Sequence, residues 1–396
     1  MKSTDPIVIS SYARTPIGSF LGALSGVAAT KLGATAIREA VRRAGVRPEA
    51  IDQVVMGCVL PAGLGQAPAR QAGLGAGLPL GAGATTVNKV CGSGLQAAIL
   101  AAAMVETGTA DIVVAGGMES MSNAPYLLQK HRVGARIGHD RMADSMYLDG
   151  LEDAYDQGRL MGAFAEEAAE AYQLTRAVQD AYALESLNRA RAAQATASFD
   201  RELVAVEVPA KAGPAAVKAD EQPTRVDPAK IPTLKPAFAE GGTVTAANSS
   251  SISDGAAAVI VTRASVAERL GLPVVARVVA HSNHAQAPAE FTSAPVPAME
   301  KALARSDWSV ADVDLYEVNE AFAVVPLIAM RELGIPHDKL NVNGGACALG
   351  HPIGASGARI LATLLAALET RDQKRGLATL CIGGGEAVAM TVERVT

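Results

Sequence analysis

The sequence predicts an α/β protein built from two repeated βαβ-type halves, with a segment of different composition and pattern inserted between them. Short β-branched runs that end in glycine alternate with Ala-rich helical stretches, as in parallel sheets covered by helices. The same order of motifs recurs in the second half of the chain, which indicates an internal repeat. The 396 residues are 49% hydrophobic and 19% charged, so the chain can bury the interior of two or three domains.

The first half alternates predicted strands and helices, as chains that build a parallel sheet do. A helical pattern over 28–44 is closed by Gly45, a residue type that commonly ends helices. The almost uncharged Ala-rich stretch at 95–105 suits a buried helix. The predicted strands are short apolar runs at 6–11, 51–56 and 111–115.

The second half repeats these features in the same order. A helix that begins at Ala298 and a strand at 313–318 correspond to the first helix and second strand of the first half. Cys91-Gly-Ser-Gly94 corresponds to Gly354-Ala-Ser-Gly357, and an apolar helix follows each. The second copy carries extra residues just before Gly354, and His351 is among them. Two similar halves with different chemical groups are what an active site between them requires.

The inserted segment separates the two halves in the sequence. It holds helical patterns at 163–172 and 175–197 and then a Pro- and charge-rich stretch at 209–236. It is predicted to be a solvated interface domain, a cap over the site, or both in different parts. The predicted division is a first half over 1–120, completed by about 243–271, an inserted loop or cap domain over 121–242, and a second half over 272–396.

Composition excludes several classes of partner and compartment. A net charge of −5 and only 4% aromatic residues argue against a nucleic-acid partner, which needs basic surfaces and stacking faces. The four cysteines are too few and too scattered for a disulfide framework. Asp5 and Pro6 stand where a signal peptide would need an apolar run. The apolar stretch at 90–105 is too short to span a membrane. We therefore expect a cytoplasmic protein with no membrane partner.

Cys91 is the first candidate catalytic residue. It lies in Asn88-Lys-Val-Cys91-Gly-Ser-Gly94, where a loop opens into the predicted helix at 95–105. A cysteine at a helix N-terminus is close to free N–H groups and to the positive end of the dipole, which favour the thiolate. The flanking glycines leave room for an acyl group. The alternative is a small buried cysteine that packs like alanine.

His351 and Cys381 lie in glycine-dense loops of the second half. His351 could hold the proton of a cysteine nucleophile, or it could be a structural histidine bonded to loop backbone. Cys381 follows a predicted strand at 377–380 and precedes three glycines. Its thiol could exchange a proton with a substrate carbon while glycine N–H groups bind an oxyanion, although a glycine triplet is also a tight turn. Metal binding by these side chains would lack the close ligand pairs of a zinc site.

Asn319 follows the predicted strand at 313–318, at the end of the sheet where open α/β proteins bind ligands. Its amide could fix a water molecule or a carbonyl group. The alternative is a helix cap, because asparagine is a good N-cap residue and a helical pattern starts at Ala321.

These residues carry a family resemblance. Over essentially its full length the chain resembles the thiolase family, acetyl-CoA C-acetyltransferase type. All the family's blocks occur in order and at matching spacing, which makes the resemblance highly specific. The matching blocks are Ala13 to Phe20, Val90 to Gln96, Gly116 to Met121, Gly242 to Ala246, Ser253 to Ala256, Asn319 to Ala323, Gly344 to Arg359 and Cys381 to Gly385.

The resemblance implies the five-layered αβαβα thiolase fold and a reversible reaction. Two acetyl-CoA condense to acetoacetyl-CoA and CoA, or a 3-ketoacyl-CoA is cleaved by CoA. Cys91 would carry the acyl group, His351 would activate it, and Cys381 would be the acid and base at the substrate α-carbon. The N–H groups of Cys91 and Gly383 would form one oxyanion hole, and His351 with a water molecule held by Asn319 would form the other.

The resemblance also implies the partners. Coenzyme A is expected as substrate and product, with no permanently bound cofactor and no metal. The assembly implied is a homotetramer, a dimer of dimers, with 121–149 as the tetramerisation segment. The residues that the resemblance places around CoA are Ser250 near the pantetheine, Arg225 near the adenine, and Leu151, Met161, Phe238 and Phe322 in the pocket wall.

Departures from the family pattern leave the acyl chain length open. Leu160 stands where short-chain biosynthetic members carry a histidine, and Phe291 replaces a methionine of their acyl pocket. Ser251 stands where a glycine usually follows the CoA-contacting serine. The first alternative is therefore a degradative 3-ketoacyl-CoA thiolase with longer-chain substrates. A non-catalytic acyl-CoA carrier and a ketosynthase, which would use a cysteine with two histidines, are further alternatives.

Overall fold

The strands of both halves are joined in one mixed sheet. The computed structural model describes residues 5–209 and 213–395. Within them the ten-stranded sheet has the order β4-β3-β5-β10-β1-β11-β14-β13-β12, with β2 paired to β10. The strands are β1 Ile7–Arg14, β2 Gly18–Ser19, β3 Gln53–Gly57, β4 Gly83–Val87, β5 Ile112–Ser120, β10 Ser253–Arg263, β11 Ala276–Ala285, β12 Leu315–Val318, β13 Arg375–Ile382 and β14 Glu386–Arg394.

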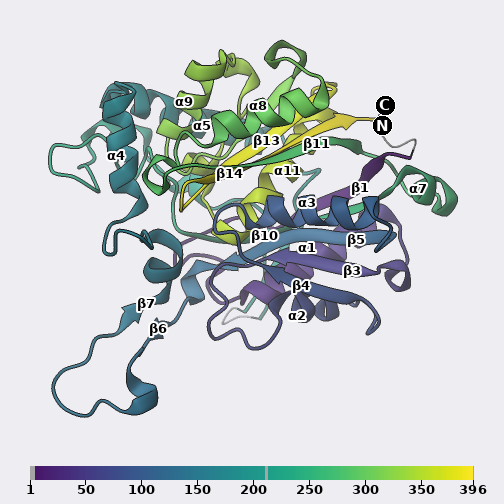
Figure 1. Cartoon of the computed structure of the whole chain (residues 1–396), viewed down its shortest axis with the longest axis horizontal. Helices are drawn as coiled ribbons and strands as arrows, with labels where there is room; N and C mark the ends of the chain where they lie inside the picture. Colours follow the sequence, from purple (N-terminus) through teal and green to yellow (C-terminus); the bar gives the residue numbers. More distant parts are fainter. Residues whose placement is uncertain (1–4, 210–212, 396) are drawn as a thin grey trace.

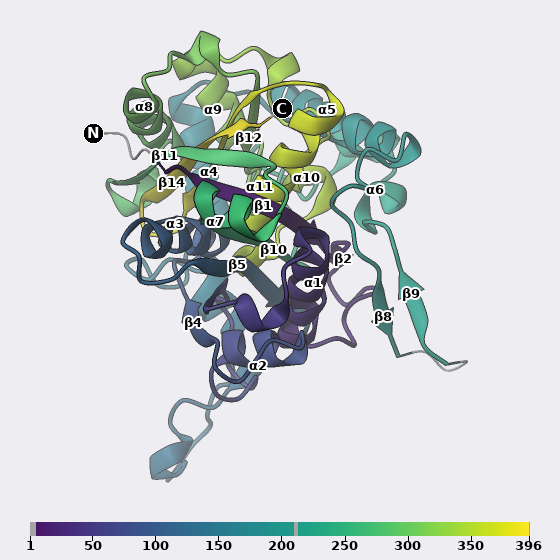
Figure 2. The same cartoon turned by 90° about the vertical axis from the view of Figure 1, so that its right-hand side faces the viewer.

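Helices cover and separate the two halves of this sheet. The described helices are α1 Ala29–Ala44, α2 Pro68–Gly75, α3 Ser93–Glu106, α4 Met161–Ala171, α5 Arg176–Ala195, α6 Gln222–Arg225, α7 Ala264–Leu270, α8 Pro295–Ser306, α9 Val324–Leu333, α10 Ala346–Leu349 and α11 Ile353–Thr370. Helix α1 packs on β1, β5 and β10, and α8 packs on β11 and β14. Helices α3 and α11 lie between, in contact with strands of both halves. The expected five-layered order is confirmed, as Figure 2 shows from α8 at the top to α2 at the bottom.

The two halves are related as the repeat predicts. The β1–β11 contact is the centre of the strand order, and on either side of it β10 corresponds to β14, β5 to β13 and β3 to β12. The counterpart of β4 is reduced to an isolated bridge between Leu340 and Tyr316. The extra residues of the second half form α10 and the turn that carries His351. The second half thereby carries an imidazole that has no counterpart in the first half.

The central helices approach closely because glycine lies at their contact. A Cβ atom on Gly357 of α11 would lie 2.2 Å from the backbone nitrogen of Leu95, and one on Gly94 of α3 would lie 2.6 Å from that of Ala358. Helix α11 is apolar and long enough by length and composition to cross a membrane, but 89% of it is buried here as a central layer. Its apolar sequence is therefore explained by its position between the two halves.

Replacing Gly357 by alanine should lower the free energy of unfolding by about 3 kcal/mol. The new methyl group would overlap backbone rather than a movable side chain, and overpacking of this kind costs about 1–3 kcal/mol even after relaxation. The measurement is the urea midpoint of the purified variant. Gly81→Ala is the control, because nothing lies within 4 Å of its added Cβ. A Gly357→Ala midpoint equal to that of the control would contradict the packing described here.

The inserted segment packs against both halves and reaches beyond the body of the molecule (Figure 1). Helices α4 and α5 lie where the sequence predicts them, and the Thr175 side chain accepts a hydrogen bond from the Val178 N–H at the start of α5. A two-stranded arm, β6 Tyr126–Leu127 with β7 Ala143–Asp144, extends away from the sheet (Figure 1). A second hairpin is formed by β8 Val206–Val208 and β9 Ala215–Val217. The boundaries of the three predicted domains remain a prediction.

Candidate active site

The predicted catalytic loops meet at one cavity between the two halves. Cys91 lies between β4 and α3, His351 just before α11, and Cys381 near the end of β13. These three residues and Gly383 line a cavity of 330 Å³. Asn319 follows β12, and its Nδ2 lies 3.5 Å from Nε2 of His351. Residues from both repeats therefore surround one space, as expected for a site built between them.

Cys91 is partly exposed in the wall of this cavity. The backbone N–H groups of Gly383 and of Cys91 itself face its sulfur and lower its pKa, as the predicted loop geometry implies. Burial acts in the opposite direction and is the larger effect, so the pKa of the Cys91 thiol is raised to about 11. The helix N-terminus therefore does not by itself produce a resting thiolate. If Cys91 is the nucleophile, its thiol has to lose its proton as it reacts.

The hydrogen bonds of His351 define which ring nitrogen is free. Its Nδ1 lies 2.5 Å from the hydroxyl of Ser356, and that hydroxyl donates to the carbonyl of Pro352 at 2.9 Å. Because the hydroxyl proton is used in this way, Nδ1 carries a proton and donates, and Nε2 has its lone pair free. Burial, and then the charge of Arg359, lowers the pKa of His351 to about 3. His351 is therefore a neutral base that presents Nε2.

Asn319 faces this free nitrogen. Its Nδ2 lies 3.5 Å from His351 Nε2, and its backbone N–H donates to Thr379 on β13 at 3.0 Å. The helix-cap interpretation is wrong, because α9 begins at Val324 and Ala323 is its N-cap. The residues after β12 form an extra turn that places the Asn319 side chain at the site instead of at a helix end.

Cys381 and the glycines after it form the second wall. Burial raises the pKa of the Cys381 thiol well above its usual value, and the nearby Cys91 raises it further. Gly384 and Gly385 have φ angles of 93° and 85°, which only glycine adopts readily. This turn directs the N–H of Gly383 toward the Cys91 sulfur, and an ion pair between Lys89 and Glu386 joins the two catalytic loops.

The pocket wall contains most of the residues expected to contact CoA. The rings of Phe238 and Phe322 meet edge to face, with centroids 6.0 Å apart, and Phe291 packs against Phe322 at 6.4 Å. Arg225 does not line the cavity: it lies on α6, paired with Glu221 at 2.5 Å, and its side chain is 61% exposed. The expected CoA residues that line the cavity are Leu151, Met161, Phe238, Ser250 and Phe322.

Sequence reasoning did not single out the residues that hold these loops in place. Glu119, at the end of β5, accepts N–H hydrogen bonds from Val59 at 2.9 Å, Leu60 at 3.2 Å and Gly354 at 2.9 Å. It therefore ties the turn after His351 to the first half, although burial raises its pKa to about 7. The sequence signal for Glu119 was its position as an acidic residue near the end of an otherwise apolar strand. Ser356 and Arg359 lie on the buried helix α11 and carried no such signal.

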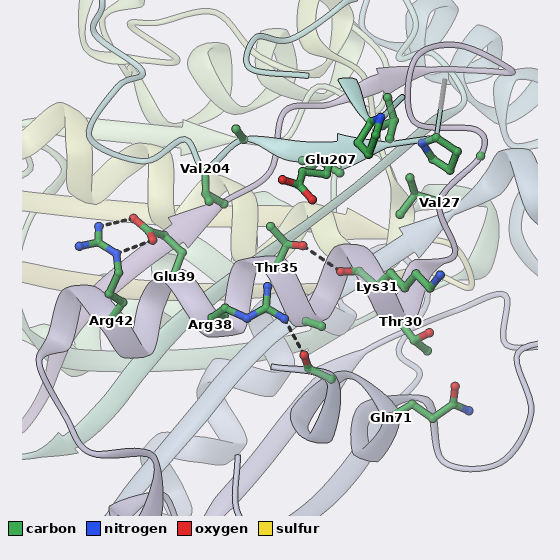
Figure 3. Close-up of a pocket in the computed structure, with 18 residues that line it drawn as sticks. Val27, Thr30, Lys31, Thr35, Arg38, Glu39, Arg42, Gln71, Val204 and Glu207 are labelled. Atoms are coloured by element: carbon green, nitrogen blue, oxygen red, sulfur yellow. Dashed lines mark hydrogen bonds and ion pairs between the residues drawn. The ribbon is translucent and has the colours of Figure 1, made fainter. Parts of the chain in front are cut away.

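A larger cavity of 940 Å³ lies away from the thiols, between α1 and the β8 hairpin (Figure 3). Two of its arginines already have partners: Arg42 binds Glu39, and Arg38 donates to the carbonyl of Gly75. It contains none of the predicted site residues. Within 5–209 and 213–395, no group of three or more His, Cys, Asp or Glu side chains gathers as metal ligands would. The smaller cavity is therefore the candidate active site.

The pKa of Cys91 gives a direct pH prediction. A thiol whose pKa is raised to about 11 stays protonated below that pH, so its thiolate fraction rises about tenfold per pH unit. We expect the rate of Cys91 alkylation by iodoacetamide, followed by peptide mapping, to rise in this way from about pH 6 to about pH 10. A plateau that begins near neutral pH would show a stabilised thiolate and contradict this description of the site.

The fold and the cavity together define a class of protein in which two α/β repeats bring two thiols and an imidazole to one cavity. Family models agree with this class. The model described as "Thiolase, N-terminal domain" matches residues 7–265, and "Thiolase, C-terminal domain" matches 272–394. The chain belongs to the thiolase family.

Individual relatives are similar to this chain over nearly its full length. The chain is 50% identical to an acetyl-CoA acetyltransferase of Cupriavidus necator over 392 residues, 98% of this chain and 99% of that protein. It is 51% identical to acetyl-CoA acetyltransferase 2 of Arabidopsis thaliana over 390 residues, 98% of this chain and 96% of that protein. The crystal structure of the Bacillus anthracis acetyl-CoA acetyltransferase matches with a TM-score of 0.96 and 38% identity, and covers 100% of both chains. The predicted family and fold are confirmed.

Proposed function

We propose that the chain is an acetyl-CoA C-acetyltransferase that makes acetoacetyl-CoA and CoA from two acetyl-CoA, and also runs in reverse. The observation that carries this proposal is that Cys91, His351 and Cys381 line one cavity, with the Asn319 amide next to Nε2 of His351. The printed names of the relatives support the acetyl specificity. Coenzyme A enters as substrate and product, with no permanently bound cofactor.

The first half-reaction forms an acyl-enzyme. The Cys91 sulfur attacks the thioester carbonyl of acetyl-CoA, and its proton passes to Nε2 of the neutral His351. The N–H groups of Cys91 and Gly383 face this sulfur, so they are placed to bind the oxyanion that develops on the carbonyl. The C–S bond to CoA then breaks, and the CoA sulfur takes the proton from His351. The acetyl group is left on Cys91.

The second half-reaction forms the carbon–carbon bond. Cys381 passes its thiol proton to Nε2 of His351, and the resulting thiolate removes a proton from the methyl carbon of a second acetyl-CoA. The protonated His351 and a water molecule held by Asn319 donate hydrogen bonds to the enolate oxygen. The enolate carbon attacks the acetyl group on Cys91, the bond to the Cys91 sulfur breaks, and acetoacetyl-CoA forms. The Cys91 thiolate then takes the proton from His351, and Cys381 keeps the proton from the substrate carbon, so both thiols are restored and the cycle balances.

The alternative with longer-chain substrates makes a different kinetic prediction. Leu160, Phe291 and Phe322 are among the residues that line the 330 Å³ cavity, and we expect their bulk to limit the space for a long acyl chain. Thiolysis of acetoacetyl-CoA, 3-ketohexanoyl-CoA and 3-ketodecanoyl-CoA by CoA decides between the two. We expect kcat/KM to fall with chain length. A rise with chain length would establish the degradative 3-ketoacyl-CoA thiolase instead.

Further properties belong to the same proposal. We place the protein in the cytoplasm and in fatty acid metabolism, without a nucleic-acid or membrane partner. We propose a homotetramer in which 121–149 is the tetramerisation segment. Its arm exposes apolar side chains that a neighbouring subunit would cover, as light scattering of the purified protein can test. The most exposed of them are Tyr126, Val133, Ile137 and Met142.

A further inference from the structure

A buried guanidinium lies behind Asn319, and the catalytic steps described so far do not use it. Arg359 is on α11 and only 2% exposed. Its Nη1 lies 3.3 Å from Glu317 Oε2 on β12, and its Nη2 lies 3.5 Å from Asn319 Oδ1. Its Nε has no hydrogen-bond partner among the residues described. The side chain therefore directs its two Nη groups to one carboxylate and to the amide of Asn319.

We propose that Arg359 is a positioning residue that fixes which end of the Asn319 amide faces the reacting thioester. A guanidinium has only N–H donors, so the amide atom that it contacts must be the acceptor Oδ1. Nδ2 is then held on the opposite side of the amide, toward His351 Nε2 at 3.5 Å. The amide NH₂ group is thereby presented as a donor at the catalytic face.

The contacts on the other side of Asn319 favour the same orientation. His351 donates through Nδ1 to Ser356, so its Nε2 can only accept a hydrogen bond. Rotating the amide by half a turn would place Oδ1 against the lone pair of Nε2, and would place the NH₂ group against the guanidinium. Both contacts would be repulsive inside a buried site, where unpaired polar groups are costly. Arg359 and His351 thus hold the amide from opposite sides.

This orientation serves the enolate step and not the acylation step. On the proposed function, Asn319 acts as a donor toward the enolate oxygen through a water molecule, whereas Cys91 is acylated with its own oxyanion donors. The positive charge of Arg359 also opposes protonation of His351. The charged groups around Arg359 are Glu317 on β12, Arg14 on β1, Glu202 after α5 and Glu320 after Asn319. Removing Arg359 together with Glu317 keeps the net charge of this cluster unchanged.

The test is a cycle of variants with two readouts. The variants are Asn319→Ala, the double variant Glu317→Met with Arg359→Met, and the triple variant that combines them. Replacing both members of a buried ion pair by apolar residues is often tolerated, whereas removing one member is not. Intact mass after mixing with acetyl-CoA reports acylation of Cys91. Exchange of the acetyl-CoA methyl protons with deuterated solvent reports enolate formation.

We expect the double variant to keep acylation within about threefold and to lose about 100-fold in methyl exchange, the size of the loss of one oxyanion donor. The triple variant should exchange no more slowly than Asn319→Ala, because Arg359 acts through that amide. The inference is overturned if the loss of methyl exchange in the triple variant equals the product of the losses in Asn319→Ala and in the double variant. It is also overturned if the double variant loses acylation as strongly as exchange.

If the double variant does not fold, Arg359→Lys replaces it, since a single ammonium cannot serve both partners. Unchanged exchange in Arg359→Lys would then overturn it. Failure of the wild-type chain to become acetylated would instead count against the proposed function.

Discussion

Cys91→Ala should abolish turnover, with thiolysis of acetoacetyl-CoA reduced by at least about 10⁴-fold. In the proposed mechanism the Cys91 sulfur takes the acyl group, and no other described thiol is placed to replace it. Cys58 and Cys347 are buried against Glu119 and Glu320, and Cys381 is oriented for a different step. Alanine removes the nucleophile but keeps the backbone N–H groups and the cavity. Steady-state release of acetyl-CoA from acetoacetyl-CoA and CoA measures the loss.

The matched control for this prediction is Cys347→Ala. It removes a buried thiol of the same chemistry that lies outside the catalytic cavity. We expect its kcat/KM to stay within about threefold of wild type, because only packing is altered. The prediction fails if Cys91→Ala keeps more than about a tenth of the wild-type rate while the control is normal. Another group would then be the acyl acceptor.

Cys381→Ala should separate the two half-reactions. Acetyl-CoA should still acylate Cys91, because that step uses His351 and the N–H groups near the Cys91 sulfur. Condensation should fall by about 10³-fold, in the range expected for the loss of a general acid and base. The high pKa that burial gives Cys381 suits it to this step, since a strong base is needed to deprotonate a carbon next to a thioester.

The measurement for Cys381→Ala combines a single-turnover experiment with steady-state kinetics. One acetyl group per subunit should appear at the wild-type rate, and acetoacetyl-CoA should then fail to accumulate. Equal losses in both steps would assign Cys381 to acylation or to the structure of the Cys91 loop. Normal condensation would remove it from the mechanism.

The fold followed from the sequence wherever local patterns agreed with the packing. The pattern over 28–44 matches α1, and Gly45 ends that helix in the left-handed conformation expected of a glycine cap. The repeat predicted an active site between the two halves, and the loops of Cys91 and Cys381, one from each half, line the same cavity. Glycine-rich loops and apolar runs are local signals, so the structure has its loops and buried elements where these patterns predict them.

Three features of the site could not be obtained in this way, because each depends on residues distant in sequence. The pKa of Cys91 is set by how deeply the loop is buried, which outweighs the local N–H groups. From the sequence alone, Asn319 could be either a helix cap or a catalytic amide. The cap is excluded only by the turn after β12, which makes Ala323 the N-cap of α9. The contact of Arg359 with Asn319 joins α11 to the end of β12, and no spacing along the chain predicts it.

Mass spectrometry tests most directly whether Cys91 carries the acyl group. The purified protein is mixed with acetyl-CoA, separated from free CoA, and measured intact and after digestion. We predict one acetyl group per subunit, located on the peptide that contains Cys91 and absent from Cys91→Ala. No adduct on wild type, or an adduct on any other residue that persists in Cys91→Ala, would contradict the account.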